Sequence, residues 1–351
     1  MVYFTLEPKK KKEDFFNMEE ELCTFVKSLD KFRLIVVKGL RRYGKTSLIH
    51  TGLNLAKVDH LFIDCRLLPL TTAPFNDFLS IIEAEISRNK KVRELIKGIE
   101  HIEIGGLIKF RIRRPETLIK FLESLKDTVV VLDEAQELRR LRFRLDYFLA
   151  YALDNLNIKI VISGSQVGLL DRFLKMEDPE APLYGRPYKS VELKPLTKDK
   201  SVEFLKTGFK QEGIIVSEEL IHKAVEAFDG VIGWLTHFGY NYVRGVKSLD
   251  LVLDKAVNLA FTEIQHFLET RGVAKDRYIE VLKTIAVTEE CSWSDIRRAL
   301  EARLGRVPDT ALANILRNLV DTSIITKINK NYTISDPILF RAVRKLLKPA
   351  T

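Results

Sequence analysis

The sequence predicts an α/β fold with a mostly parallel sheet in the first half of the chain and a helical second half. Short apolar segments that suit strands buried on both faces lie at 32–37, 61–65, 129–132 and 159–163. Segments with apolar residues at helical spacing separate them, at 14–30, from 45 onwards, and at 75–97, 115–126 and 141–155. Strands that alternate with helices imply right-handed crossovers, and these make neighbouring strands parallel.

One segment inside this α/β region has a different pattern. Residues 101–112 alternate apolar and polar side chains around the pair Gly105-Gly106. This alternation with a central glycine pair predicts a β-hairpin at the periphery of the sheet.

The second half of the chain is predicted to be helical. Residues 197–270 have helical spacing and almost no strand signal, with Gly230 and Gly233 as interruptions. These glycines either let a lid helix begin close to a ligand or simply separate two helices.

The C-terminal part has the outline of a winged helix. Helices predicted at 276–286, 293–304 and 309–321 precede two alternating segments around Asn329-Lys330-Asn331. We therefore predict three domains, at 1–195, 196–272 and 273–351.

Composition restricts the class of protein. The chain has 351 residues, of which 46% are hydrophobic, and a formal net charge of +9. A basic balance favours polyanionic partners such as nucleotides, nucleic acid or acidic membrane surfaces, without choosing among them. Three scattered cysteines and the absence of a long apolar stretch predict reduced thiols, no membrane span and a cytoplasmic location. The N-terminal basic run follows a short apolar stretch, which is not the order of a signal peptide.

A loop of the phosphate-binding type follows the first predicted strand. Residues 39–46, GLRRYGKT, match G-x-x-x-x-G-K-[ST] between a buried-strand pattern and an amphipathic helix. Glycines let the backbone wrap closely around phosphates and point N–H groups at them. We expect Lys45 to reach the β and γ phosphates of a nucleotide and the Thr46 hydroxyl to bind Mg²⁺. The predicted nucleotide-binding residues are Gly39, Arg41, Arg42, Tyr43, Gly44, Lys45, Thr46 and Ser47.

Two features of this loop stay open at the level of sequence. A basic strand-to-helix turn without a ligand is the alternative to a nucleotide site. Arg41 and Arg42 occupy spacer positions that a phosphate cradle does not specify. We expect their side chains to point toward a neighbouring domain, a subunit or the γ-phosphate.

Two acidic residues end the strand predicted at 129–132. In the segment VVVLDEAQ, Asp133 and Glu134 come where a strand tip would face the phosphate loop. We expect Asp133 to hold Mg²⁺, directly or through water. Glu134 is the expected general base, which polarises water for attack on the γ-phosphate. The alternative is a strand that simply meets a solvated turn.

Other strand ends and one loop supply further candidates. Ser163 and Ser165 end a strand that we expect between the phosphate-loop strand and the Asp133 strand. Their hydroxyls either contact the γ-phosphate or the attacking water, or only form a turn. Arg186, in the segment PLYGRP, either reaches a phosphate in its own or a neighbouring subunit or is a surface arginine. Asp64, at another strand end, either supports the site residues from behind or, as we expect, is a cap.

The order of these motifs resembles the archaeal ATPase family, within the STAND-type branch of AAA+ P-loop NTPases. After an N-terminal helix, the motifs that carry the resemblance are GLRRYGKTS at 39–47, DCR at 64–66, LDEAQ at 132–136, SGS at 163–165 and LYGRP at 183–187. The resemblance covers roughly 14–270 and implies an AAA+-like additional-strand sheet, a helical lid and a C-terminal winged helix. It implies ATP or ADP with Mg²⁺ at Lys45, Thr46, Asp133 and Glu134, and a phosphate contact for Arg186.

The sequence departs from this family at two places. Residues 17–21, NMEEE, stand where related proteins have a Gly-Arg-x-x-E motif. Residues 230–234, GVIGW, lack the proline that is common in the lid. The N-terminal contact and the lid contact to nucleotide are therefore open.

These observations predict a slow, Mg²⁺-dependent ATPase that acts as a molecular switch and repositions its lid and winged helix. One alternative is an ATP-gated regulator whose winged helix binds DNA, with Asn314 and Asn318 as base-reading side chains. Another is a scaffold that holds ADP tightly. The partner on the winged helix, DNA or a protein, and the oligomeric state are not determined by the sequence.

Overall fold

The chain divides into two units, Pro8–Lys194 and Pro195–Thr351, and residues Met1–Glu7 belong to the second. This division comes from a computed structural model. It describes residues 2–69, 71–89, 92, 94, 102–105, 107–110, 115–125 and 128–347, without the side chains of 102–105, 107–110 and 115–118. The finer division into three domains stays a prediction.

A five-stranded parallel sheet forms the centre of the first unit, with the strand order β2-β5-β6-β1-β7. Its strands are β1 (Leu34–Lys38), β2 (His60–Asp64), β5 (Val129–Asp133), β6 (Lys159–Gly164) and β7 (Lys189–Glu192). The predicted parallel sheet is confirmed, and β6 lies between β1 and β5 as expected. The edge strand β7 was missed because three of its four residues are polar and only Val191 is fully buried.

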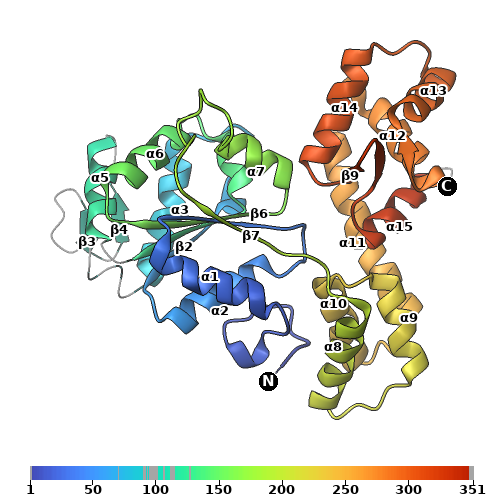
Figure 1. Ribbon diagram of the computed structural model, residues 1–351, viewed down its shortest axis with the longest axis horizontal. Helices are drawn as coiled ribbons and strands as arrows, with labels where there is room; N and C mark the ends of the chain where they lie inside the picture. Colours follow the sequence, from blue (N-terminus) through green and yellow to red (C-terminus); the bar gives the residue numbers. More distant parts are fainter. Residues whose placement is uncertain are drawn as a thin grey trace. The chain divides into compact units, whose positions relative to one another are not determined.

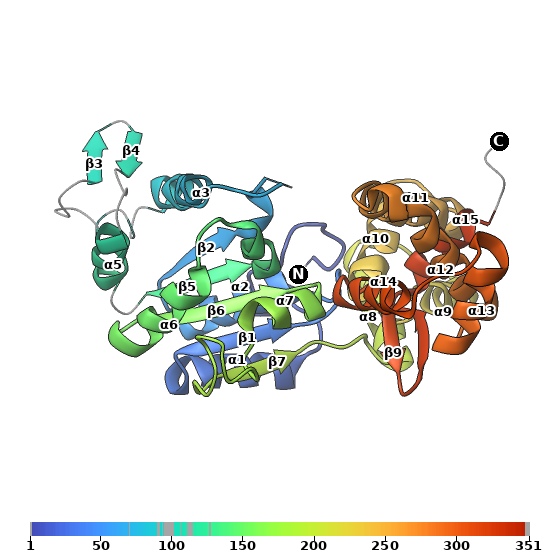
Figure 2. The ribbon, with the colours of Figure 1, turned by 90° about the horizontal axis from the view of Figure 1, so that it is seen from above.

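Helices cover both faces of this sheet (Figures 1 and 2). One face carries α1 (Glu19–Lys31) and α2 (Lys45–Ala56), and the other carries α3 (Phe75–Arg88), α6 (Leu145–Asn155) and α7 (Val167–Leu174). Leu34 and Val36 of β1 belong to the core formed with α3, α6 and α7. Since side chains alternate along a strand, Ile35 and Val37 point to the face of α1 and α2, and all four are buried. Burial on both faces explains the continuous apolar runs.

The predicted hairpin is present, but it is not part of this sheet. β3 (Ile102–Gly105) and β4 (Leu107–Phe110) pair antiparallel in a two-stranded sheet of their own, and α5 (Pro115–Ser124) follows. Gly106 and most of the predicted helical segment 89–97 lie outside the described residues.

The second unit begins with four helices, as its periodicity predicted. They are α8 (Lys198–Gln211), α9 (Glu218–Phe228), α10 (Ile232–Val243) and α11 (Leu249–Glu269). The side chains of Thr197, Ser217 and Ser248 cap the N-termini of α8, α9 and α11. None of the helices in the described part of the chain combines the length and apolar character that crossing a membrane requires.

The winged helix predicted for the C-terminal part is confirmed. After a 3₁₀ turn (Gly272–Ala274), its elements are α12 (Lys275–Thr288), β8 (Cys291–Ser292), α13 (Trp293–Leu304), α14 (Asp309–Asp321), β9 (Ile325–Ile328), β10 (Asn331–Ile334) and α15 (Pro337–Lys345). The three strands form one sheet in the order β8-β10-β9. α13 and α14 begin and end at the predicted residues, and a Ser292–Asp295 capping box fixes the start of α13.

Polar contacts join the winged helix to the preceding helices within this unit. The indole N–H of Trp234 in α10, which is only 1% exposed, donates to the carboxylate of Asp336 at 3.0 and 3.2 Å. The same carboxylate caps α15 by accepting the N–H groups of Ile338 and Leu339 at 2.8 and 2.9 Å. One acidic residue therefore ties the start of α15 to the core of α10.

The N-terminal residues are anchored in the same unit. The ring of Phe4 is buried against Phe204 and Phe209. A Cβ added at either Gly208 or Gly239 would lie 2.3 Å from this ring, so both glycines are needed to make room for it.

Gly230 forms a tight contact between the α9–α10 turn and Leu196, which precedes α8. Its φ of +73° is left-handed, its carbonyl accepts the N–H of Leu196 at 2.8 Å, and a Cβ there would lie 2.1 Å from the Leu196 carbonyl oxygen. Only glycine fits this position, which gives Gly230 a packing role. Gly233 lies in the first turn of α10.

We expect Gly230→Ala to lower the free energy of unfolding by about 3 kcal/mol or more, because it adds a backbone clash to a strained φ. Gly213→Ala is the matched control, since Gly213 has a similar φ of +66° but open space around its Cβ position. It should cost only about 1 kcal/mol. Denaturant unfolding of both variants measures the difference, and equal losses would contradict the packing role.

Candidate nucleotide-binding site

The predicted phosphate loop links the end of β1 to the start of α2. Gly39 has a φ of +152°, and a Cβ there would lie 3.1 Å from the carbonyl oxygen of Leu193. Gly44, with a φ of +87°, is the N-cap of α2. Arg42 is also left-handed, with a φ of +67°. A non-glycine residue in this region is strained, and such strain is typical of ligand-binding loops.

Lys45 is a buried cation at the centre of this loop, with 4% of its surface exposed. Its Nζ donates to the carbonyl oxygens of Gly39 and Leu40, both at 2.9 Å, so the ammonium is enclosed by its own loop. Burial lowers the pKa of Lys45, while the carboxylates of Glu134 and Asp133 partly oppose this effect. The side chain is therefore held where phosphates above the N-terminus of α2 would meet it.

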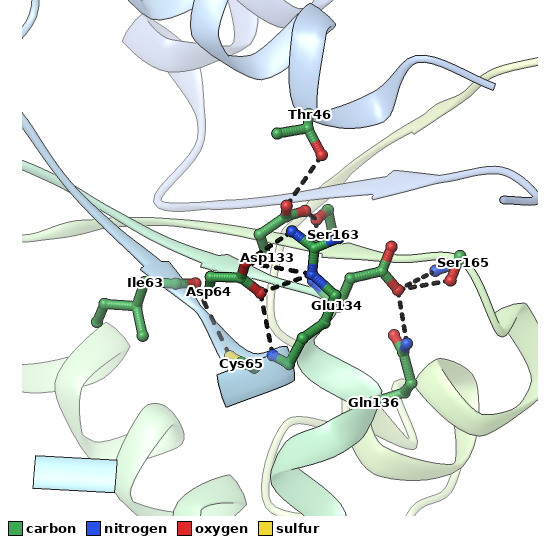
Figure 3. Close-up of polar contacts among 10 residues, drawn as sticks. Thr46, Ile63, Asp64, Cys65, Asp133, Glu134, Gln136, Ser163 and Ser165 are labelled. Carbon is green, nitrogen blue, oxygen red and sulfur yellow. Dashed lines mark hydrogen bonds and ion pairs between the residues drawn. The ribbon is translucent and has the colours of Figure 1, made fainter. Parts of the chain in front are cut away.

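Asp133 joins the phosphate loop to the neighbouring strands (Figure 3). It is 1% exposed, its Oδ2 accepts the Thr46 hydroxyl at 2.9 Å, and its Oδ1 accepts the Ser163 hydroxyl. Burial and the nearby charge of Glu134 raise the pKa of the Asp133 carboxyl above its ordinary value, against the effect of the two hydroxyls and Lys45. A buried carboxylate that carries this electrostatic cost is suited to bind a cation.

These residues fit a magnesium ion. Mg²⁺ prefers oxygen ligands and is held in nucleotide sites by one or two protein groups together with substrate phosphates. The paired oxygens of Thr46 and Asp133 supply such groups. In the described part of the chain, no group of three or more His, Cys, Asp or Glu side chains forms a metal site on its own.

Glu134 is held by one of its two carboxylate oxygens. Its Oε2 accepts the Ser165 hydroxyl at 2.5 Å, the Ser165 N–H at 3.1 Å and the Gln136 side-chain amide at 2.6 Å (Figure 3). The backbone of Glu134 is left-handed, with a φ of +53°. Burial raises the pKa of this carboxyl, but Lys45 and the donors from Ser165 and Gln136 outweigh it, so the net pKa is lowered. Glu134 is thus kept ionised.

Gln136 was not recognised as a site residue, whereas Asp64 was expected to be a cap or to support the site. Gln136 donates to Glu134, and its signal was the fifth letter of LDEAQ. Asp64, which pairs in register with Asp133, caps the short 3₁₀ helix Cys65–Leu67 by accepting the Arg66 N–H at 3.0 Å, so the predicted cap is confirmed. It also holds the Arg66 guanidinium in a fork at 2.8 and 2.6 Å. The Arg66 charge lowers the pKa of Lys45, and the charges of Asp133 and Glu134 raise the pKa of Arg66, after its hydrogen bond with Asp64.

The other predicted loop residues surround this centre. Ser47 accepts the Lys9 N–H at 3.0 Å, which ties the N-terminal basic run to α2. Tyr43 is buried and Arg41 is exposed, and the Arg41 charge contributes to the lowered pKa of Lys45, after burial. The loop arginine at 41 therefore lies within electrostatic reach of the phosphate site.

Arg186 lies near the amino ends of the strands, whereas the phosphate loop lies at their carboxyl ends. It precedes the amino end of β7, and β7 is parallel to β1, whose carboxyl end carries the loop. Its Nε donates to Asp154 at 2.9 Å, and Asp154 is near the end of α6, just before β6 begins. Within one chain, the structure does not bring Arg186 to Lys45 and Glu134.

The residues predicted to read DNA have different surroundings. In α14, Asn314 is exposed, but the Asn318 amide donates to the Tyr278 hydroxyl at 2.8 Å. In α13, Arg297 and Arg298 pair with acidic residues of the winged helix. These contacts use side chains that a DNA interface would need for phosphates and bases.

The raised pKa of Asp133 predicts a gain in stability on its neutralisation. When the pKa of a carboxyl rises on folding, the free energy of unfolding of the protein falls as pH increases from the ordinary pKa to the raised pKa. Asp133→Asn removes this charge and keeps an acceptor for Thr46. At pH 7 without divalent cations, we expect its melting temperature to rise by about 2–4 °C.

Asp146→Asn supplies the control of opposite sign. Burial of Asp146 is outweighed by its hydrogen bond with Arg144, which lowers the pKa of Asp146, so neutralisation should lower the melting temperature. Thermal unfolding monitored by circular dichroism compares the two variants. A lower melting temperature for Asp133→Asn would contradict the electrostatic cost assigned to Asp133.

The chain is similar to two known families and to solved structures. A family model described as an ATPase domain predominantly from Archaea matches residues 15–238, and a model of the MCM protein C-terminal winged helix-turn-helix domain matches 272–335. No curated protein matches the chain. The solved structure of a Walker-type ATPase of Pyrococcus abyssi is 34% identical, with a TM-score of 0.84, over 98% of this chain and 100% of that chain.

Two other solved structures match the chain at lower similarity. Cdc6p from Pyrobaculum aerophilum is 16% identical over 97% of both chains, with a TM-score of 0.49. The RuvB Holliday junction branch migration motor of Thermotoga maritima is 15% identical over 99% of both chains, with a TM-score of 0.46. The STAND branch stays a prediction. Because the ATPase-domain model covers more than half of the chain, the chain belongs to the family of ATPase domains found predominantly in Archaea.

Proposed function

We propose that this ATPase is a Mg²⁺-dependent molecular switch that hydrolyses ATP slowly and uses the cycle to reposition its second unit. The observation that supports the proposal is the hydrogen-bonded cluster of Thr46, Asp133, Ser163 and Glu134 around the phosphate loop. A loop with phosphate-binding geometry, a cation-binding carboxylate and a separate ionised carboxylate are the parts that phosphoryl transfer to water requires.

The proposed roles follow from the contacts. The loop N–H groups and Lys45 bind the phosphates, and Thr46 with Asp133 holds Mg²⁺, which neutralises charge on the phosphate oxygens when bound. Glu134 accepts a proton from the attacking water. Ser163 orients Asp133 and Ser165 orients Glu134, so we assign these serines a supporting role.

The proposed output is the unit that contains the helices α8–α11 and the winged helix. The Trp234–Asp336 contact and the hydrogen bond from Lys345 to Asn258 at 2.5 Å join its two halves. Lid and winged helix would then move as one body. The winged helix is the proposed docking surface for a partner. The pairing of Arg297, Arg298 and Arg303 with acidic residues of the winged helix favours a protein over DNA.

The first test concerns the general base. Glu134→Gln keeps the shape of the side chain but cannot accept the proton, so we expect kcat to fall at least about 100-fold. ATP affinity, measured by calorimetry with Mg²⁺, should stay within a few-fold. Glu123→Gln, at an exposed position of α5, is the control that should retain full turnover. Undiminished phosphate release from Glu134→Gln would contradict the proposal, and tight ADP without turnover in the wild type would favour the scaffold.

The second test concerns Arg186, which we propose acts on the phosphates of a neighbouring chain. We expect Arg186→Ala to lower turnover by about a thousandfold. A mixture of this variant with Glu134→Gln should regain turnover. The Arg186→Ala chain keeps Glu134, and a neighbouring Glu134→Gln chain supplies Arg186. Each variant alone at the same total concentration is the control. Full activity of Arg186→Ala alone, or no recovery on mixing, would contradict a role between chains.

A further inference from the structure

Gln136 is a buried polar side chain with only one end of its amide hydrogen-bonded among the described residues. It lies two residues after Glu134, in the 3₁₀ helix Ala135–Arg140, and is 1% exposed. Its Nε2 donates to Glu134 Oε2 at 2.6 Å. Its own Oε1 is buried and has no hydrogen-bond partner among the described residues. A buried amide oxygen without a hydrogen bond lowers the stability of the fold. Such a cost calls for an explanation, and the hydrogen bond that the amide nitrogen donates to Glu134 offers one.

We propose that Gln136 is a positioning residue for hydrolysis: with Ser165 it holds Glu134 by Oε2 and leaves Oε1 as the oxygen that takes the proton of the attacking water. This inference rests on the proposed role of Glu134 as general base. It adds a residue outside the phosphate loop to the machinery of the site.

The hydrogen bonds separate the two oxygens of Glu134. Oε2 accepts three donors, two from Ser165 and one from Gln136, while Oε1 accepts none from the described residues. An oxygen whose lone pairs are already engaged is a poorer proton acceptor than its free neighbour. In the proposed step the water proton passes to Oε1 and the water oxygen bonds to the γ-phosphorus. The bond from that phosphorus to the bridging oxygen breaks, and ADP leaves.

A neutral amide suits this role better than a charged side chain. Gln136 donates a hydrogen bond to the carboxylate but has no proton to give up, so it orients Glu134 without competing as an acid or base. The left-handed backbone of Glu134 restricts its rotamers but does not set the plane of its carboxylate. The second and third donors on Oε2 fix that plane.

The neighbouring strand leaves room for this glutamine. Gly164 of β6 lies beside Gln136, and a Cβ added there would be 2.7 Å from Gln136 Oε1 and 2.9 Å from Leu170. Gly164→Ala therefore displaces the amide while leaving Gln136 and Glu134 unchanged in sequence. It provides an independent way to disturb the clamp formed by Gln136 and Ser165.

The experiment compares kcat and KM for Mg²⁺-ATP at pH 7 in the full-length protein. Gln136→Met removes the donor at similar volume. We expect kcat to fall about tenfold with KM within twofold, because Gln136 orients the base and does not bind phosphate. Gln136→Glu replaces the donor by an acceptor beside Glu134 and should lower kcat further, again with KM within twofold.

Gln211→Met is the matched control. Gln211 also uses one end of its amide, accepting the Tyr3 N–H at 3.0 Å, while its other end is buried without a partner among the described residues. It lies in the second unit, so its loss should leave kcat and KM unchanged. Gly164→Ala should lower kcat with KM little changed, as Gln136→Met does.

An unchanged kcat in both Gln136 variants would overturn the inference, whatever their melting temperatures. A merely structural glutamine would lower the melting temperature without lowering kcat at constant KM. The general-base assignment fails separately, if Glu134→Gln retains turnover. If Glu134→Gln is inactive and the Gln136 variants keep the wild-type kcat, only the positioning role is lost.

Discussion

The hydrogen bonds that Asp133 accepts from Thr46 and Ser163 are the interaction on which the site depends. They connect three segments that are distant in sequence: the start of α2, the end of β5 and the end of β6. Parallel strands deliver their carboxyl ends to one edge, so a single carboxylate there can meet both neighbours. Through these hydrogen bonds, one side chain joins the start of α2 to the strand ends that carry Glu134 and Ser163.

The electrostatics of this edge are arranged by burial and pairing. Burial acts against the charged form of Lys45, Asp133 and Glu134 alike, yet Glu134 stays ionised because Lys45, Ser165 and Gln136 stabilise its charge. The pKa of Asp133 stays raised and that of Lys45 stays lowered, so both groups carry an electrostatic cost. A site that is costly before its ligands arrive gains when a cation and phosphates supply the missing charges, which links ligand binding to stability.

The second unit combines parts that look independent in sequence. The helical segment and the winged helix have different periodicities, but Asp336 serves both as the cap of α15 and as the partner of Trp234 in α10. The N-terminal Phe4 also belongs here, in the space left by Gly208 and Gly239. Such contacts between distant segments rest on shape and on single hydrogen bonds, and these leave no periodic signal.

Local patterns in the sequence were sufficient for the parallel sheet, the winged helix and the residue types around the phosphate loop. Buried strands need continuous apolar runs, helices need a 3.6-residue period, and phosphate-binding loops need glycines before a lysine, so each leaves a readable trace. The tertiary structure was needed for the edge strand β7, the clamp on Glu134 by Gln136, the Asp64–Arg66 fork and the position of Arg186 near the amino ends of the strands. The edge strand and the position of Arg186 depend on strand order and packing. The contacts of Gln136 with Glu134 and of Arg66 with Asp64 join residues two positions apart, but they depend on side-chain conformations that no sequence period records.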